Sequence, residues 1–233
     1  MREVSYPCRL QPDLHILEDP AAAVGELLAE QARAGGSIVL TGGSTPGNAY
    51  RRAAELQPDW SRVTLWWGDE RCVPPDDERS NYRLANETLL GLLDALPKTV
   101  HRIRGEAPPA EAAAELDAAL AGVTLDVVLL GLGPDGHMAS LFPGSPQLQV
   151  ADRRATDGPP GLEPWVHRVT FTVPTIQSAK RVVFLVSGAG KADAVARAFG
   201  GEISEAVPAS LARLAPRVEV FLDGAAGDKL DRR

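Results

Sequence analysis

The sequence predicts an α/β fold with a doubly wound, mostly parallel, Rossmann-like sheet flanked by helices. Apolar runs of strand length alternate with helical patterns along the chain, which is typical of this class. The run at 125–130, LDVVLL, is almost free of polar residues, as in a parallel strand covered on both faces. Glycine-rich turns follow several of these runs, where open α/β sheets bind their ligands. We expect residues 1–233 to form a single domain with right-handed crossovers.

The composition indicates a globular cytoplasmic protein. Of the 233 residues, 44% are hydrophobic and 24% are charged, and no apolar run reaches the length of a membrane span or a signal peptide core. The net charge of −7 argues against a nucleic-acid or membrane partner, but it allows a local basic pocket for a phosphorylated metabolite. Two cysteines, Cys8 and Cys72, are too few for a disulfide framework or a structural zinc site.

Helix and strand signals alternate in order. Asp19-Pro20 can cap a helix, and Gly35-Gly36 can end it. Ser80 can cap another, whose inner face would carry Ala85, Thr88, Leu89 and Leu92. Strands are expected at 37–40, 63–67, 100–103, 125–130, 169–173, 181–186 and 218–222, after one or two short strands before residue 19. Helices are expected at 20–34, 46–56, 110–120, after 80, after 191 and from 208.

Two stretches lack these signals. Residues 147–165 are polar and rich in Gly and Pro, and we expect a mobile excursion on the surface. After the turn at 131–136 we expect only a short helix, because Pro143-Gly144 would stop it.

The turn GLGPDG at 131–136 follows the 125–130 strand and leads into His137. An imidazole titrates near neutral pH, so at a strand end it is a natural general base, and Asp135 is an acidic neighbour. The alternative is a solvated loop histidine. The turn also matches the dinucleotide-binding pattern G-x-G-x-x-G, but that fold needs a full helix here and normally carries the pattern after its first strand.

TGGSTP at 41–46 is a second strand-end loop. The backbone amides of Gly42 and Gly43, with the hydroxyls of Ser44 and Thr45, could cradle an anion at the start of a helix. The alternative is a tight turn whose hydroxyls cap that helix. It is not a nucleophile elbow, because Pro46 stands where the motif needs glycine.

Two further loops carry charge. GDER at 68–71 offers Asp69 and Arg71, and the arginine could bind a phosphate through two parallel hydrogen bonds. The alternative is a solvated salt-bridge cluster. SGAGK at 187–191 places Lys191 at a helix start, as a phosphate ligand or as an exposed lysine. Nucleotide hydrolysis is disfavoured, because Ala192 replaces the Ser or Thr that would hold magnesium.

Together these loops resemble the 6-phosphogluconolactonase family, within the superfamily that includes the glucosamine-6-phosphate deaminases. The pairing of GDER with SNY, and of GPDGH with ASLFPG, is typical of the lactonase branch. A deaminase would carry a DEY-type loop and FNEP, where this chain has Arg71 and Ser140–Pro143. The similar stretches are LTGGSTP (40–46), WWGDERCVPPDDERSNYRLANETLL (66–90), GLGPDGHMASLFPGSP (131–146), RVTFTVPTI (168–176) and FLVSGAGKADA (184–194).

The resemblance implies the fold shared with deaminases, ribose-5-phosphate isomerases and CoA transferases. It also implies hydrolysis of 6-phospho-D-glucono-1,5-lactone in the oxidative pentose phosphate pathway. His137 would activate water, while Asp69 and Asp135 would orient it or hold sugar hydroxyls. No metal or cofactor is expected. The substrate-binding residues implied are Gly42, Gly43, Ser44, Thr45, Arg71, Gly133, Arg168 and Lys191.

The expected partner is therefore this small-molecule substrate, with the protein a monomer or weak homodimer. Two alternatives stay open. A deaminase or isomerase would act on glucosamine 6-phosphate, which the missing FNEP glutamate disfavours. A non-catalytic sugar-phosphate sensor would be expected to carry a DNA-binding module, for which the chain has no room.

Overall fold

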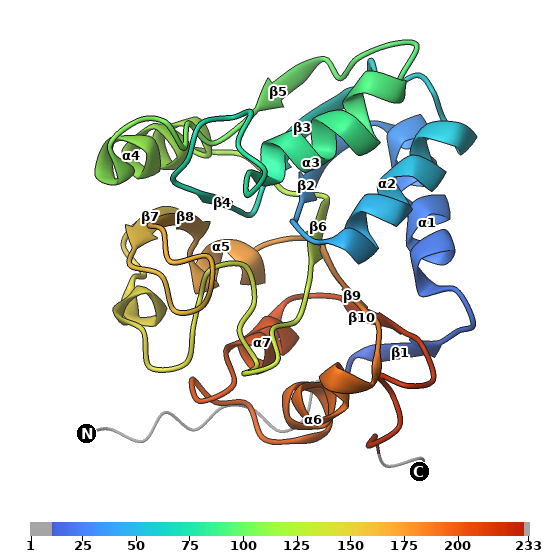
Figure 1. Ribbon diagram of the computed structural model, residues 1–233, viewed down its shortest axis with the longest axis vertical. Helices are drawn as coiled ribbons and strands as arrows, with labels where there is room; N and C mark the ends of the chain where they lie inside the picture. Colours follow the sequence, from blue (N-terminus) through green and yellow to red (C-terminus); the bar gives the residue numbers. More distant parts are fainter. Residues whose placement is uncertain (1–10, 231–233) are drawn as a thin grey trace.

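A computed structural model describes residues 11–230, and its main feature is a seven-stranded sheet in which every neighbouring pair is parallel (Figure 1). This confirms the predicted fold class. The strands, in spatial order, are β1 (Asp13–Ile16), β10 (Val218–Leu222), β9 (Arg181–Val186), β6 (Val127–Leu130), β2 (Gly36–Leu40), β3 (Val63–Trp67) and β5 (Thr99–His101).

This strand order contains one reversal. From β2 the chain moves outward through β3 to β5, and it then returns to β6 on the other side of β2 and continues to β9 and β10. The loops that leave β2 and β6 therefore run in opposite directions. Such a switch point leaves a crevice at the carboxyl ends of the two strands.

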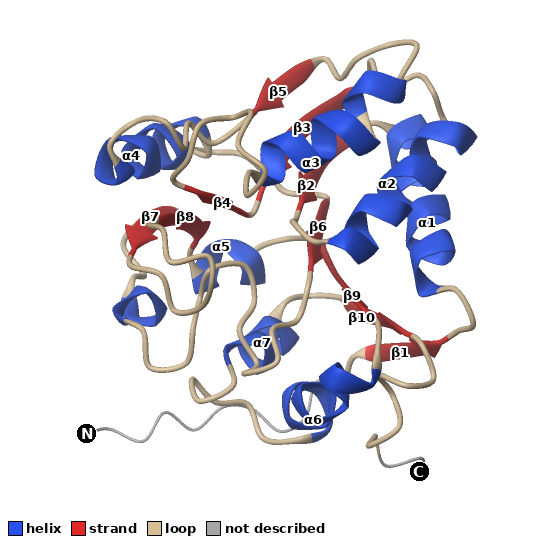
Figure 2. Cartoon of the chain, viewed as in Figure 1, coloured by secondary structure: helices blue, strands red, loops and turns tan. Residues whose placement is uncertain are grey.

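Helices cover both faces of this sheet. Helices α1 and α2 lie on one side, and α5 and α7 lie on the other (Figure 2). Asp19 caps α1 by accepting a hydrogen bond from the Ala22 N–H (2.9 Å), and Gly35 ends it with a φ of 83°. The helices are α1 (Pro20–Ala34), α2 (Ser44–Leu56), α3 (Asn81–Thr88), α4 (Pro109–Ala119), α5 (Val173–Gln177), α6 (Ala192–Val195) and α7 (Pro208–Leu211). No helix within residues 11–230 is long and apolar enough to cross a membrane.

A second, antiparallel sheet corrects two predictions. It has the order β4 (Asp69–Arg71), β8 (Arg168–Phe171) and β7 (Ala155–Gly158). The GDER loop is therefore partly a strand, and the predicted excursion at 147–165 contains one as well. The prediction failed because β7 depends on pairing with β8, which local composition does not reveal.

Three local predictions are also wrong. No helix follows the histidine turn, because residues 138–141 form a tight turn closed by the Leu141 N–H on the Met138 carbonyl (2.9 Å). Helix α2 begins at Ser44, since a proline is tolerated in the first turn, where N–H groups have no intrahelical partner. Leu92 is exposed because α3 ends at Thr88.

The Tyr50 side chain fixes the end of β2. Its phenol is fully buried, donates to the Thr41 carbonyl (2.6 Å) and accepts from the Thr41 N–H (2.9 Å). Burial raises the pKa of Tyr50, so the phenol stays protonated and can serve both roles. One side chain of α2 thus satisfies both backbone polar groups of Thr41, at the point where the chain leaves the sheet.

Replacement of Tyr50 by phenylalanine should lower the free energy of unfolding by about 1–3 kcal/mol, because both polar groups of Thr41 lose their buried partner. Urea unfolding followed by circular dichroism would measure this. Tyr82→Phe is the control, since it removes a hydroxyl from a half-buried ring that packs against Trp67. Equal losses in the two variants would contradict the role of the Tyr50 hydroxyl.

Candidate active site

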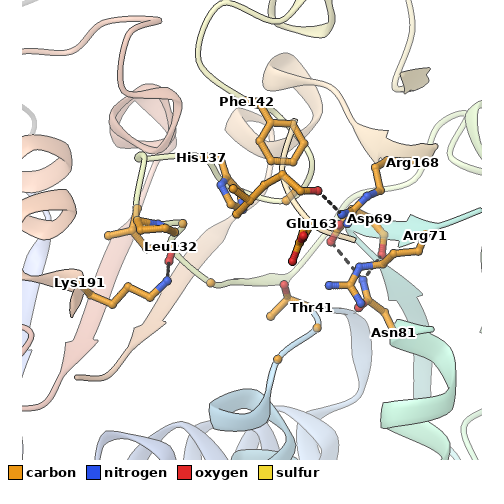
Figure 3. Close-up of a pocket in the computed structure, with 17 residues that line it drawn as sticks. Thr41, Asp69, Arg71, Asn81, Leu132, His137, Phe142, Glu163, Arg168 and Lys191 are labelled. Atoms are coloured by element: carbon orange, nitrogen blue, oxygen red, sulfur yellow. Dashed lines mark hydrogen bonds between the residues drawn. The ribbon is translucent and has the colours of Figure 1, made fainter. Parts of the chain in front are cut away.

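A cavity of about 290 Å³ lies at the carboxyl ends of β2 and β6, at the switch point (Figure 3). Residues 41–43, after β2, form one wall, and the turn after β6 forms another with His137. Side chains from β4, α3 and β8 close the remaining side. The structure therefore gathers loops that the sequence placed far apart.

His137 is paired with Asp135. Its Nδ1 lies 2.6 Å from Asp135 Oδ1, and its backbone N–H donates to the same oxygen at 3.1 Å. A proton on Nδ1 then faces the carboxylate, which leaves Nε2 as the basic nitrogen. Burial raises the pKa of Asp135, but the hydrogen bonds and charge of His137 outweigh burial and leave it lowered. The carboxylate can thus accept the Nδ1 proton and orient the imidazole.

Gly133 and Phe142 pack against the imidazole from outside the pair. A Cβ at Gly133 would lie 2.0 Å from His137 Nδ1, so only glycine allows this approach. The Phe142 ring is tilted against the imidazole, with ring centroids 4.6 Å apart. Gly133 was expected to bind substrate, but its N–H donates to the His137 carbonyl (2.9 Å).

Asp69 lies on β4 and also lines the cavity, but it has different partners. Its carboxylate is buried and accepts from Ser140 Oγ (2.7 Å) and, at 3.5 Å, from Asn81 Nδ2. Of the two predicted aspartates, Asp135 is the one hydrogen-bonded to His137. Asp69 is left to face the cavity as a fixed acceptor.

Arg168 is buried and lines the cavity, and its guanidinium also binds backbone carbonyls of a neighbouring loop. Its guanidinium donates to the carbonyls of Leu162 (3.2 Å), Pro164 (3.0 Å) and Val166 (3.2 Å). Burial lowers the pKa of Arg168, with Asp69 opposing that shift. Arg168 thereby holds residues 162–166 beside the cavity while it contributes positive charge there.

Two more cations line the same cavity. An Arg71 nitrogen donates to the Arg79 carbonyl, and its buried Nε has no hydrogen-bond partner within the described part of the chain. Lys191 Nζ donates to the Leu132 carbonyl (2.7 Å). Burial lowers the pKa of Lys191, and nearby Asp135 partly offsets this. Both are oriented by carbonyl groups and can bind an anion.

The anion cradle predicted at 41–46 is divided between two cavities. Gly42 and Gly43 line both of them, whereas Ser44 and Thr45 line only an adjoining cavity of about 210 Å³. Lys191 also borders both. The two hydroxyl residues therefore lie beside, and not within, the larger cavity.

Several lining residues were not predicted. Asn81 lines the cavity, and Ser140, which does not, is hydrogen-bonded to the lining Asp69. They belong to the SNY and ASLFPG stretches, so the motifs that carry the resemblance were the signal that could have identified them. Leu162 and Glu163 come from the predicted excursion and carry no local signal. Glu163 is labelled in Figure 3. Between residues 11 and 230, no group of three or more His, Cys, Asp or Glu side chains could hold a metal ion.

Comparison with known families decides the relationship. Residues 15–221 match the family described as glucosamine-6-phosphate isomerases/6-phosphogluconolactonase. The chain belongs to this family. Among similar proteins, the 6-phosphogluconolactonase of Mycobacterium tuberculosis is 38% identical, with 89% of this chain and 91% of the relative covered. That of Streptomyces coelicolor is 36% identical, with 94% and 93% covered.

Solved structures in this family agree on the fold. The 6-phosphogluconolactonase of Trypanosoma brucei superposes with a TM-score of 0.82 and 29% identity, covering 94% of this chain and 99% of that one. A monomeric glucosamine-6-phosphate deaminase gives 0.84 at 23% identity, covering 93% and 99%. Since both branches fit equally well, the backbone does not separate them. The sequence matches and the site residues carry that distinction.

The Gly133→Ala variant should break the pair between His137 and Asp135, because the added methyl would overlap the imidazole and the carboxylate. Overpacking of this kind costs about 1–3 kcal/mol. We expect the hydrogen-bonded imidazole proton to disappear from the low-field NMR spectrum. Gly131→Ala is the matched control, since nothing lies within 4 Å of its added carbon. Retention of the signal in Gly133→Ala would disprove the close packing.

Proposed function

We propose that this chain is an enzyme that hydrolyses 6-phospho-D-glucono-1,5-lactone to 6-phosphogluconate. The observation that carries the proposal is the His137–Asp135 pair, which presents a basic nitrogen in a cavity lined by Arg71, Arg168 and Lys191. A lactone ester needs an activated water, and its phosphate needs positive charge. The lactonases of similar sequence support the same substrate.

In this mechanism, water attacks the lactone carbonyl and gives its proton to His137 Nε2. Asp135 stabilises the imidazolium through Nδ1. The tetrahedral intermediate then breaks its bond to the ring oxygen, which takes the proton from Nε2 and leaves as the product hydroxyl. Amides of the turns at 42–43 and 131–132 supply donors for the oxyanion, because the Gly133 N–H is already used.

The rest of the cavity binds the sugar phosphate. Arg71, Arg168 and Lys191 hold the phosphate, with Ser44 and Thr45 assisting from the adjoining cavity. Asp69 accepts a hydrogen bond from a sugar hydroxyl. These contacts hold the reacting carbonyl beside His137. Orienting the reacting groups in this way lowers the activation barrier for hydrolysis. We further propose that the protein acts in the cytoplasm, as a monomer or weak homodimer, without metal or cofactor.

Generating the lactone in the assay and following its loss above the spontaneous rate tests this function. We expect fast hydrolysis that a chelator does not inhibit, and no ammonia from glucosamine 6-phosphate. Ammonia release would instead support the deaminase branch. Binding of 6-phosphogluconate without turnover would support a sensor.

The His137→Ala variant should lower kcat by about 10²–10⁴-fold, the usual contribution of a general base. Because the phosphate site is untouched, KM should change little. His167→Ala, which alters an exposed histidine next to β8, is the matched control and should keep full turnover. Near-normal kcat in His137→Ala would rule out its role as base.

Affinity for 6-phosphogluconate should fall as pH rises, starting below the usual titration range of lysine, because burial lowers the pKa of Lys191. Above its pKa the amine is neutral and loses its attraction for phosphate. Calorimetric titration across the alkaline range would measure this. Lys191→Arg should remove the alkaline loss, and Lys191→Ala should weaken binding about 10- to 100-fold at neutral pH. The same alkaline loss in Lys191→Arg would assign it to another group.

A further inference from the structure

A buried side-chain hydrogen bond joins the turn that follows β6 to strand β4. Ser140 Oγ, from the turn that follows His137, donates to Asp69 Oδ2 on β4 at 2.7 Å. The exposed fractions of Ser140 and Asp69 are 4% and 5%, so water hardly competes for this bond. A hydrogen bond to a buried carboxylate is among the stronger ones in proteins.

The backbone around Ser140 is arranged to make this contact. Ala139 has a φ of 48°, the one non-glycine residue with positive φ within the described chain. Its turn is closed by the Leu141 N–H on the Met138 carbonyl (2.9 Å), and the Ser140 N–H donates to Thr170 Oγ1 on β8 (3.2 Å). Such strain persists only where surrounding contacts fix it, and it is concentrated at functional sites.

The other side of Asp69 is held by α3. Asn81 Nδ2 donates to the Asp69 carbonyl at 2.9 Å and lies 3.5 Å from Oδ1. Ser140 therefore holds one carboxylate oxygen tightly, while Asn81 restrains mainly the backbone. Without the serine hydroxyl, the carboxylate could rotate away from the orientation in which it faces the cavity.

We propose that Ser140 is a positioning residue for substrate binding, which acts by fixing the Asp69 carboxylate toward a hydroxyl of the sugar. This rests on the proposed function, and it makes the turn that carries His137 responsible for the sugar site as well. Chemistry and hydroxyl recognition are thereby tied to one backbone segment. Ser140 does not line the cavity, so its removal should affect KM and leave kcat within about threefold.

A double-mutant cycle tests this assignment. Ser140→Ala should raise KM for the lactone about 10- to 100-fold. In an Asp69→Ala background the same change should alter kcat/KM by less than about threefold, because no carboxylate is left to position. Ser145→Ala is the matched control, since its buried hydroxyl has no hydrogen-bond partner within the described residues, and it should behave as wild type.

Two results would overturn the proposal: equal effects of Ser140→Ala in both backgrounds, or a fall in kcat at unchanged KM. If Ser140→Ala does not fold at the assay temperature, Ser140→Cys gives the same test, because it keeps the volume with a weaker donor. Wild-type turnover tests the proposed function separately. If it is absent, the cycle is measured as Kd for 6-phosphogluconate, where equal effects in both backgrounds again reject the role of Ser140.

Discussion

The pairing of β2 with β6 is the constraint on which the rest of the site depends. The ladder is short, joining Ile38 to Val127 and Val39 to Val128. Because the chain winds outward in opposite directions from these two strands, no crossover covers their carboxyl ends. The glycine loop and the histidine turn diverge from adjacent strands and leave the cavity between them. The charged side chains of the site, among them Asp69, Arg71 and Lys191, line the cavity that opens there.

The contact between His137 and Asp135 could be anticipated because it is local. Asp135 and His137 are two residues apart, and Gly133 precedes them in the same turn, so the sequence itself holds the groups that must meet. The helix caps at Asp19 and Ser80 are local in the same way, and both were predicted correctly. Hydrophobic runs likewise identified the central strands, because burial on both faces leaves no alternation.

What could not be predicted depends on partners distant in the chain. Ser140 and Asp69 are 71 positions apart, and nothing in the sequence of either segment indicates that the two are in contact. The polar stretch at 147–165 resembled a loop because β7 is stabilised by β8 and not by its own composition. Strand order was undetermined for the same reason: an apolar run indicates that a strand is buried, but not which strand lies beside it.

Buried polar groups, more than the apolar core, determine the precise shape of the side of the cavity formed by β4 and α3. Glu70 accepts hydrogen bonds from the backbone N–H groups of Arg71, Asn81 and Tyr82 and from the Ser80 hydroxyl. Burial raises its pKa although these donors oppose the shift, so the carboxylate is retained at an energetic cost. The hydrogen bonds from Ser80, Asn81 and Tyr82 to Glu70 hold the start of α3 against β4. They thereby place Asn81 beside Asp69. An apolar residue could fill the same volume, but it would leave these N–H groups unpaired and the start of α3, with Asn81, less firmly held.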